Sequence, residues 1–333
     1  MISLVIQTSF IGDVVLTTPL IASLAARGPV DVVATRLGAS VLVGNPHVRH
    51  LLAYDKRGKD RGVSGLLRIA RLVRAESGDA AAYLAQGSLR SGLLARLAGY
   101  GKRIGFETSP GRVLYTHRVR LRRDRHHAER LLRLSLGEHA EIPLGTLRPH
   151  LYPSTEDRTA VDQLLGAAPN EDRSLIALAP GSVWATKRWP YYAELAAALQ
   201  QTHRSVIVGS GDDTPLAAEI VRATGGDAVD ATGRLTLLGS AELIGRCRAI
   251  VTNDSAPLHL ASAMNTPTIA IFGPTVPAFG FGPLAHASVI AEHRSLDCRP
   301  CHPHGPMVCP LGHWRCMRDL SLETVVARVT ALT

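Results

Sequence analysis

The chain has 333 residues, of which 46% are hydrophobic and 20% charged, so it is long enough for two folded domains and too apolar to be disordered. Only 5% of the residues are aromatic, which argues against a stacking surface for single-stranded nucleic acid. The net charge of +9 is unevenly distributed: residues 1–150 hold 23 Lys and Arg against 11 Asp and Glu, while residues 151–333 hold 14 against 17. The basic first half favours binding of an acidic partner. The alternative is a basic surface that only contacts solvent.

Short apolar runs alternate with helical patterns along the whole chain. In the first half we predict strands over residues 3–6, 30–34, 50–54 and 80–84, and helices over 14–26 and 66–75. In the second half we predict strands over 175–179, 205–209, 228–231, 249–252 and 268–272, and helices over 191–201, 215–224, 237–247 and 257–264. Such alternation predicts parallel sheets with helices on both faces.

Residues 141–156 contain three prolines and little periodicity, so they form the predicted linker. We therefore predict an α/β protein with two Rossmann-like domains, residues 1–150 and 151–333, facing each other across a cleft. The N-terminus lacks the pattern of a cleavable signal, and the longest uncharged stretch, residues 255–291, is interrupted by five prolines and three glycines. We expect a cytoplasmic protein without a membrane-spanning helix.

One carboxylate, Asp13, stands between the first predicted strand and the following helix, and it is the only charge in the segment IQTSFIGDVVLTTPLIASL (residues 6–24). Ligands of such sheets bind beyond the carboxyl ends of the strands, which is where we expect Asp13. The side chain can act on a ligand there, or it can be the N-cap of the helix after Gly12.

Basic residues of the first half are candidates for binding an anionic ligand, because Arg presents a planar fork to phosphate or carboxylate. These candidates are Arg90, Lys102, Arg103, Arg120, Arg122 and Arg123.

In the second half, the segment LAPGSVWATKRWPYYAELAAAL (residues 178–199) places a polar loop between a strand and a helix. The hydroxyl of Ser182, the amine of Lys187 and the N–H groups of a helix start are typical of a phosphate site. The alternative is an ordinary connecting loop with solvated basic residues.

Three more strands of the second half end in residues that can bind a nucleotide. Asp212, in the segment GSGDD, can hold a ribose hydroxyl. Asp254, Ser255 and Ala256 lie at a helix start, which favours an anion site, although the first two can also be simple N-caps. His259 follows on the same helix, where a packed or solvated histidine is the alternative, and Gly273 begins a Gly-Pro-Thr turn.

Four cysteines lie close together near the C-terminus, in the pattern C-x2-C-x7-C-x6-C. They are Cys298, Cys301, Cys309 and Cys316, with His302, His304 and His313 among them. Such soft ligands can bind a structural zinc ion, although the last two spacings differ from those of a common zinc ribbon. A reduced cluster or a local disulfide is the alternative.

Four motifs in this order resemble glycosyltransferase family nine, the ADP-heptose:lipopolysaccharide heptosyltransferases: SFIGDVVLTTP; PGSVWATKRWP; NDSAPLHLASAM with PTIAIFGPT; and CRPCHPHGPMVCPLGHWRCMRDL. The resemblance extends over nearly the whole chain, and the cysteine-bearing tail is most similar to the heptosyltransferase II subtype. It implies a GT-B fold, an ADP-heptose donor and an anionic glycolipid acceptor, lipid A with inner-core sugars. Some of the basic residues of the first half can instead hold the protein on the anionic inner face of the inner membrane, and we expect no nucleic-acid partner.

The resemblance and the strand-end positions together assign roles to residues. Asp13 becomes the catalytic base of an inverting transfer that needs neither a metal nor another cofactor. Residues 1–150 become the acceptor domain, with the six basic residues named above, and residues 151–333 become the donor domain. The donor-binding residues are then Ser182, Lys187, Asp212, Asp254, Ser255, Ala256, His259 and Gly273.

The chain departs from the family pattern at two positions, Val183 in place of a second hydroxyl residue and Ala256 in place of a frequent Gly, and both concern diphosphate binding. Two other functions stay open. The same fold can use another nucleotide sugar, as a different glycosyltransferase or an epimerase. A non-catalytic nucleic-acid-binding protein would need a recognition helix or stacking aromatics, and the sequence shows neither.

Overall fold

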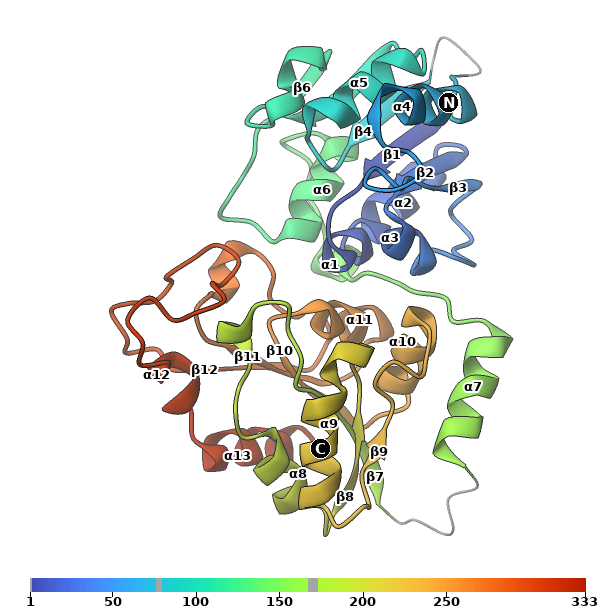
Figure 1. Ribbon diagram of the computed structural model, residues 1–333. Coiled ribbons are helices and arrows are strands. Elements are labelled where there is room, and N and C mark those ends of the chain that lie inside the picture. Colours follow the sequence, from blue (N-terminus) through green and yellow to red (C-terminus); the bar gives the residue numbers. More distant parts are fainter. Residues whose placement is uncertain (1, 76–79, 167–172) are drawn as a thin grey trace. The chain divides into compact units, whose positions relative to one another are not determined.

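The computed structural model describes residues 2–75, 80–166 and 173–333, and the chain divides into two compact units between Tyr152 and Pro153 (Figure 1). This division falls two residues beyond position 150 and within the stretch expected to be a linker. Among the described residues, no helix combines the length and the hydrophobicity that crossing a bilayer requires.

The first unit is built on a parallel six-stranded sheet with the strand order β3-β2-β1-β4-β5-β6. Its strands are β1 (Ser3–Gln7), β2 (Val30–Ala34), β3 (His50–Ala53), β4 (Ala81–Leu84), β5 (Lys102–Phe106) and β6 (His117–Val119). The central strands β1, β2 and β4 are buried along their whole length, as their apolar runs predict. The sequence did not predict β5 and β6, because β5 begins with two charged residues and β6 has only three residues.

The helices of the first unit are α1 (Ile11–Val15), α2 (Thr18–Ala25), α3 (Arg36–Ser40), α4 (Gly62–Leu72), α5 (Leu89–Leu97) and α6 (His127–Leu136), with 3-10 turns η1 (Pro110–Leu114) and η2 (Leu144–Leu147). The single helix expected over residues 14–26 is divided into α1 and α2. Pro19 has no N–H to donate to the carbonyl of Val15, and the hydroxyl of Thr18 donates to that carbonyl instead, at 2.9 Å.

The second unit repeats the plan with a parallel sheet of order β12-β11-β10-β7-β8-β9. Its strands are β7 (Ser174–Ala179), β8 (His203–Ile207), β9 (Val229–Asp230), β10 (Ala249–Asn253), β11 (Thr268–Phe272) and β12 (Ser288–Glu292). Its helices are α7 (Thr155–Leu165), α8 (Tyr192–Leu199), α9 (Thr214–Ala223), α10 (Leu237–Gly245), α11 (Ala256–Met264), α12 (Arg315–Arg318) and α13 (Leu322–Leu332), with turns η3 (Ala185–Lys187), η4 (Gly211–Asp213) and η5 (Pro277–Phe279).

The parallel pairing decides where polar residues can gather. All strand pairs in both sheets are parallel, so the carboxyl ends of the strands of a sheet share one edge. The loops at this edge that are considered below follow β1, β3 and β6 in the first unit, and β7, β8, β10 and β11 in the second. Loops at these two edges carry most of the residues discussed below.

Candidate functional site

Asp13 lies at the carboxyl edge of the first sheet, as the third residue of α1. One carboxylate oxygen accepts a hydrogen bond of 2.8 Å from the hydroxyl of Ser9, and the other is 3.4 Å from Nε2 of His127. The N-cap of α1 is Phe10, whose side chain makes no capping bond. Asp13 is therefore not the N-cap, and its side chain, 18% exposed, is held by two polar groups near the surface.

His127 begins α6 and is the residue that sequence reasoning missed at this site. Burial, and secondarily the charges of Arg130 and His126, lower the pKa of His127 to about 3, so its imidazole is neutral at neutral pH. At neutral pH the contact with Asp13 therefore joins a neutral imidazole to a carboxylate and is not an ion pair. The buried guanidinium of Arg130 adds a positive charge that interacts with Asp13.

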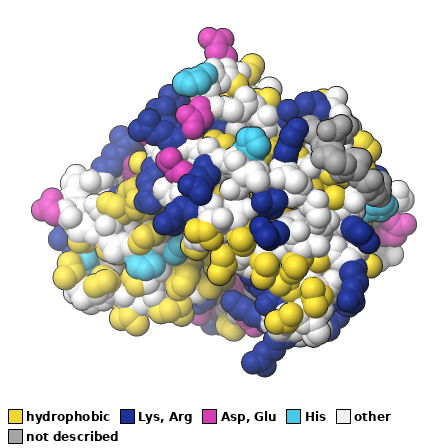
Figure 2. All heavy atoms as spheres, turned by 90° about the horizontal axis from the view of Figure 1, so that it is seen from above, with side chains coloured by type: hydrophobic (Ala, Val, Ile, Leu, Met, Phe, Trp, Pro, Cys, Tyr) yellow, Lys and Arg dark blue, Asp and Glu magenta, His cyan; other side chains and the backbone are white. Residues whose placement is uncertain are grey.

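Three of the six basic candidates follow β6 at the same edge as Asp13. Arg122 forms an ion pair of 2.9 Å with Asp124, while Arg120 and Arg123 are exposed. His127, which contacts Asp13, comes only a few residues later, so this loop is adjacent to the carboxylate. Figure 2 shows Lys and Arg side chains spread over one face of the molecule, with fewer acidic side chains among them.

The other three basic candidates have different positions. Lys102 and Arg103 begin β5, at the opposite edge of the sheet from Asp13, which argues against contact with a ligand held by Asp13. Arg103 also donates to the carbonyls of Leu114 and Tyr100, at 2.7 and 2.5 Å.

Arg90 is engaged by the protein in a similar way. Its guanidinium donates to the hydroxyl of Tyr54, lies 5.3 Å from the centre of that ring, and donates to the carbonyls of Asp60 and Gly62. Arg90 and Arg103 thus hold loops of the first unit together.

Another basic group, the run KRGKDRG (residues 56–62), follows β3 at the same edge as Asp13 and was missed by sequence reasoning. Lys56 donates to the carbonyl of Thr8 at 2.9 Å. Burial, Arg57 and Arg90 lower the pKa of Lys56. The sequence did contain a signal for this group: a run of basic residues that comes soon after a predicted strand lies at the edge of the sheet where ligands bind.

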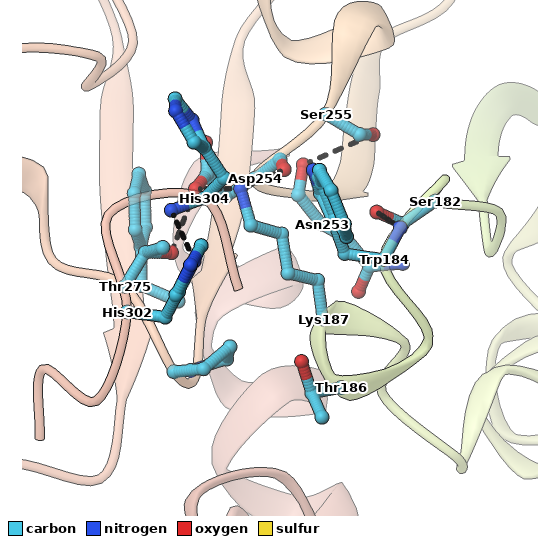
Figure 3. A network of polar contacts seen from close by, with 12 residues as sticks. Ser182, Trp184, Thr186, Lys187, Asn253, Asp254, Ser255, Thr275, His302 and His304 are labelled. Carbon is cyan, nitrogen blue, oxygen red and sulfur yellow. Dashed lines mark hydrogen bonds and ion pairs between the residues drawn. The ribbon is translucent and has the colours of Figure 1, made fainter. Parts of the chain in front are cut away.

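In the second unit, Lys187, Asp254 and Thr275 come from three different loops and meet in one cluster (Figure 3). They follow β7, β10 and β11, so the shared sheet edge brings them together. The amine of Lys187 donates to a carboxylate oxygen of Asp254 at 2.6 Å and to its carbonyl at 3.2 Å. The hydroxyl of Thr275 donates to the same carboxylate oxygen at 2.7 Å. The side chains of Lys187 and Asp254 are only 9% and 11% exposed.

Ser182 and Asn253 connect the loops around this cluster. The buried hydroxyl of Ser182 accepts a hydrogen bond of 3.3 Å from the N–H of Trp184, and its carbonyl accepts two from Arg188. Asn253 donates to the carbonyl of Pro180 at 2.8 Å and accepts from the N–H of Trp189 at 3.2 Å. Asn253 therefore fixes the loop after β7 to β10, a role that its place at the end of a buried strand could have indicated.

The start of α11 provides backbone donors beside Asp254. Ser255 is the N-cap residue by position, yet no capping bond from its side chain is found in the described structure, and its hydroxyl donates to the carbonyl of Asn253 at 3.4 Å. Ala256 is the first residue of the nine-residue helix. The helix start therefore retains the polarity that favours an anion.

The remaining predicted donor residues lie around this edge with varied surroundings. Asp212 is exposed in η4, whereas its neighbour Asp213 forms a capping box with Ser210. His259 is buried in α11, with its ring 6.3 Å from that of Phe281 in an edge-to-face arrangement. Gly273 has a packing requirement, since a Cβ there would be 2.7 Å from the sulfur of Met317.

All five cysteines are free thiols. The sulfur of Cys298 is 3.9 Å from Nε2 of His313, while Cys316 is buried in the core of the second unit, where burial raises its pKa to about 11. Among the residues that the structure describes, no group of three or more His, Cys, Asp or Glu side chains is arranged to hold a metal ion.

Comparisons with known proteins agree on one family. The family model described as glycosyltransferase family 9 (heptosyltransferase) matches residues 66–314. Lipopolysaccharide heptosyltransferase 2 of Escherichia coli strain K12 is 29% identical over 307 residues, which is 85% of each chain. Lipooligosaccharide heptosyltransferase 2 of Haemophilus influenzae is 28% identical over 295 residues, 83% of this chain and 84% of the relative.

Solved structures give the same result for the fold. The structure of E. coli ADP-heptose lps heptosyltransferase II superposes with a TM-score of 0.80 and 25% identity, covering 100% of this chain and 98% of the other. A glycosyltransferase family 9 structure from Veillonella parvula has a TM-score of 0.84 and 24% identity, covering 99% and 96%. These likenesses confirm the predicted α/β fold of GT-B type.

Proposed function

This chain belongs to glycosyltransferase family 9, and on that premise we propose that it transfers heptose from an ADP-heptose donor to the inner core of lipopolysaccharide, with inversion at the anomeric carbon. The observation that carries the proposal is the cluster of Lys187, Asp254 and Thr275 beside the start of α11, because it joins a cation, a carboxylate and helix N–H groups at one ligand edge.

The donor diphosphate is assigned to this cluster in the second unit. As the bond between the anomeric carbon and the phosphate oxygen breaks, ADP leaves with the electron pair and gains negative charge. Lys187 and the N–H groups at the start of α11 stabilise that charge in a largely buried setting. Asp254 holds the amine of Lys187 in place and can accept hydrogen bonds from the sugar hydroxyls.

The acceptor hydroxyl is assigned to Asp13 in the first unit. In a single displacement the hydroxyl oxygen bonds to the anomeric carbon while its proton passes to the Asp13 carboxylate. Ser9 and neutral His127 orient this carboxylate without protonating it. The positive charge of Arg130 favours its ionised form.

The acceptor is an anionic glycolipid, lipid A with inner-core sugars, and we assign its phosphates and carboxylates to the exposed arginines after β6. Arg120 and Arg123 are the main candidates, with Lys56 and Arg57 on the loop after β3. The same basic residues support peripheral contact with the cytoplasmic face of the inner membrane, where each contributes about 1 kcal/mol. Sedimentation with anionic vesicles measures this contact, and binding that survives high salt unchanged would contradict it.

A panel of donors tests the proposed function. The purified chain is incubated with truncated inner-core lipopolysaccharide and with ADP-heptose, UDP-linked or GDP-linked sugars, and product is followed by mass spectrometry. Transfer should require ADP-heptose, and calorimetry should show ADP binding more tightly than UDP or GDP. Equal or preferential use of a UDP sugar would instead favour an enzyme of the same fold with another donor.

A further inference from the structure

Residues 299–306 begin directly after Cys298 and include Cys301. This segment is held against the loops that supply Lys187, Asp254 and Thr275, which we call the donor cluster. The guanidinium of Arg299, 5% exposed, donates to the carbonyl of Thr275 at 3.1 Å and pairs with Glu292 at 2.9 Å. The N–H of Cys301 donates to the carbonyl of Pro274 at 3.1 Å. The segment is thus attached to the turn that supplies Thr275.

The other end of the segment is attached to the loop that supplies Lys187. Both the N–H and the hydroxyl of Thr186 donate to the carbonyl of Pro306. Gly305 is buried at φ +82°, and a Cβ at this position would be 3.1 Å from Cε of Lys187. The backbone at Gly305 therefore passes directly against the Lys187 side chain, and a side chain at this positive φ would be strained and would crowd the lysine.

This path brings two histidines to the donor cluster. His302 and His304 are exposed, and the centre of each ring is 6.4 Å from that of Trp184, with His304 nearly parallel to it at 17°. Nδ1 of His302 accepts a hydrogen bond of 3.0 Å from the N–H of His304, so Nε2 is the nitrogen of His302 available to a ligand. Figure 3 shows both histidines grouped with Lys187, Asp254 and Thr275.

The donor cluster needs further hydrogen-bond donors to balance the negative charge of a diphosphate. Lys187 is paired with Asp254 at 2.6 Å, so the two side chains together have no net charge. The diphosphate of a sugar nucleotide is esterified at both ends and carries about one negative charge on each phosphate, and the terminal phosphate of released ADP gains a further ionisation with a pKa of about 6. Hydrogen bonds from imidazole N–H groups, neutral or charged, can supply part of the missing compensation.

We propose that His302 and His304 bind the donor diphosphate together with Lys187, so that the segment of residues 299–306 forms one wall of the phosphate site. This inference rests on the proposed function, which places the diphosphate at Lys187.

Two substitutions separate ligand binding from local structure. His302→Asn keeps an oxygen where Nδ1 accepts from the His304 N–H, but it removes the Nε2 donor. His304→Phe keeps the ring beside Trp184 and removes both nitrogens. The matched control is His286→Asn, because exposed His286 precedes β12 at the opposite edge of the same sheet.

Calorimetry with ADP, AMP and inorganic pyrophosphate measures the effect. Each of the two variants should bind ADP and pyrophosphate about tenfold more weakly, the size of one lost hydrogen bond to a charged group, with a smaller loss for AMP. The control should match the wild type.

The outcomes distinguish this inference from the proposed function. ADP and pyrophosphate affinities within twofold of wild type in the folded double variant would overturn the histidine assignment, as would an equal loss for AMP. If UDP binds as well as ADP while pyrophosphate affinity still falls in the variants, the donor assignment fails and the histidine assignment stands. Circular dichroism and thermal unfolding of the variants establish that each is folded.

Discussion

The sharpest test of the proposed chemistry is Asp13→Asn. In the wild-type protein, Asp13 accepts from Ser9 at 2.8 Å and lies 3.4 Å from Nε2 of His127. Asn keeps both contacts in altered form: its amide donates to the Ser9 hydroxyl, whose own hydrogen then goes to Oε1 of Gln7, 2.7 Å away, and its oxygen takes the place of the carboxylate oxygen that faces Nε2 of His127. The substitution therefore removes the basic carboxylate while it preserves the shape of the site.

The two possible roles of Asp13 predict effects of different size. Loss of an acidic residue in the first turn of a helix costs about 0.3–1 kcal/mol. Exchange of a charged for a neutral hydrogen-bond acceptor adds about 1 kcal/mol, so the free energy of unfolding should fall by only about 1–2 kcal/mol. Loss of a general base should slow transfer by about 10²–10⁴-fold, or about 2.7–5.5 kcal/mol in barrier height.

The assay is the rate of ADP release at saturating donor and acceptor, with denaturant unfolding and ADP calorimetry on the same preparation. ADP affinity should change little, because Asp13 belongs to the other unit. A matched control is Asp31→Asn, which removes a buried carboxylate paired with Arg49 at 2.7 Å in the same unit and should cost stability without slowing turnover. Near wild-type turnover of Asp13→Asn would refute the assignment of this residue as the base.

Three further predictions follow from named contacts. Lys187→Met should leave the buried Asp254 carboxylate without its cationic partner and lower the free energy of unfolding by about 3–5 kcal/mol. The double variant Lys187→Met, Asp254→Asn should recover most of this loss. Denaturant titration of the wild type, the single variant and the double variant measures both effects. Because the folded-state pKa of His127 is about 3, the stability that it contributes should be complete above about pH 6.5 and lost as the pH falls toward 3, and an equally steep pH profile of unfolding in His127→Gln would contradict this. Arg123→Glu should raise the acceptor KM and leave the ADP dissociation constant unchanged, and an equal loss of ADP affinity would show that the acceptor and donor roles of the two units are wrongly divided.

The sequence by itself determined the fold class and the general location of the site. Apolar runs that alternate with helical patterns require parallel sheets, because strands buried on both faces lose the polar alternation of exposed strands. Parallel strands share a carboxyl edge, so residues in the segments between a strand and the next helix, such as Asp13, Lys187 and Asp254, could be assigned to ligand edges from position alone. The family motifs then supplied the chemistry of the donor and the acceptor.

Only the tertiary structure decided which of these residues touch and which candidates are occupied elsewhere. Local periodicity could not show that α6 brings His127 to Asp13, that backbone carbonyls engage Arg90 and Arg103, or that the tail brings His304 to the donor cluster. These contacts join loops distant in sequence, and their geometry depends on the path of each loop. That path follows from packing and from backbone hydrogen bonds such as those of Thr186, which a pattern of neighbouring residues does not encode.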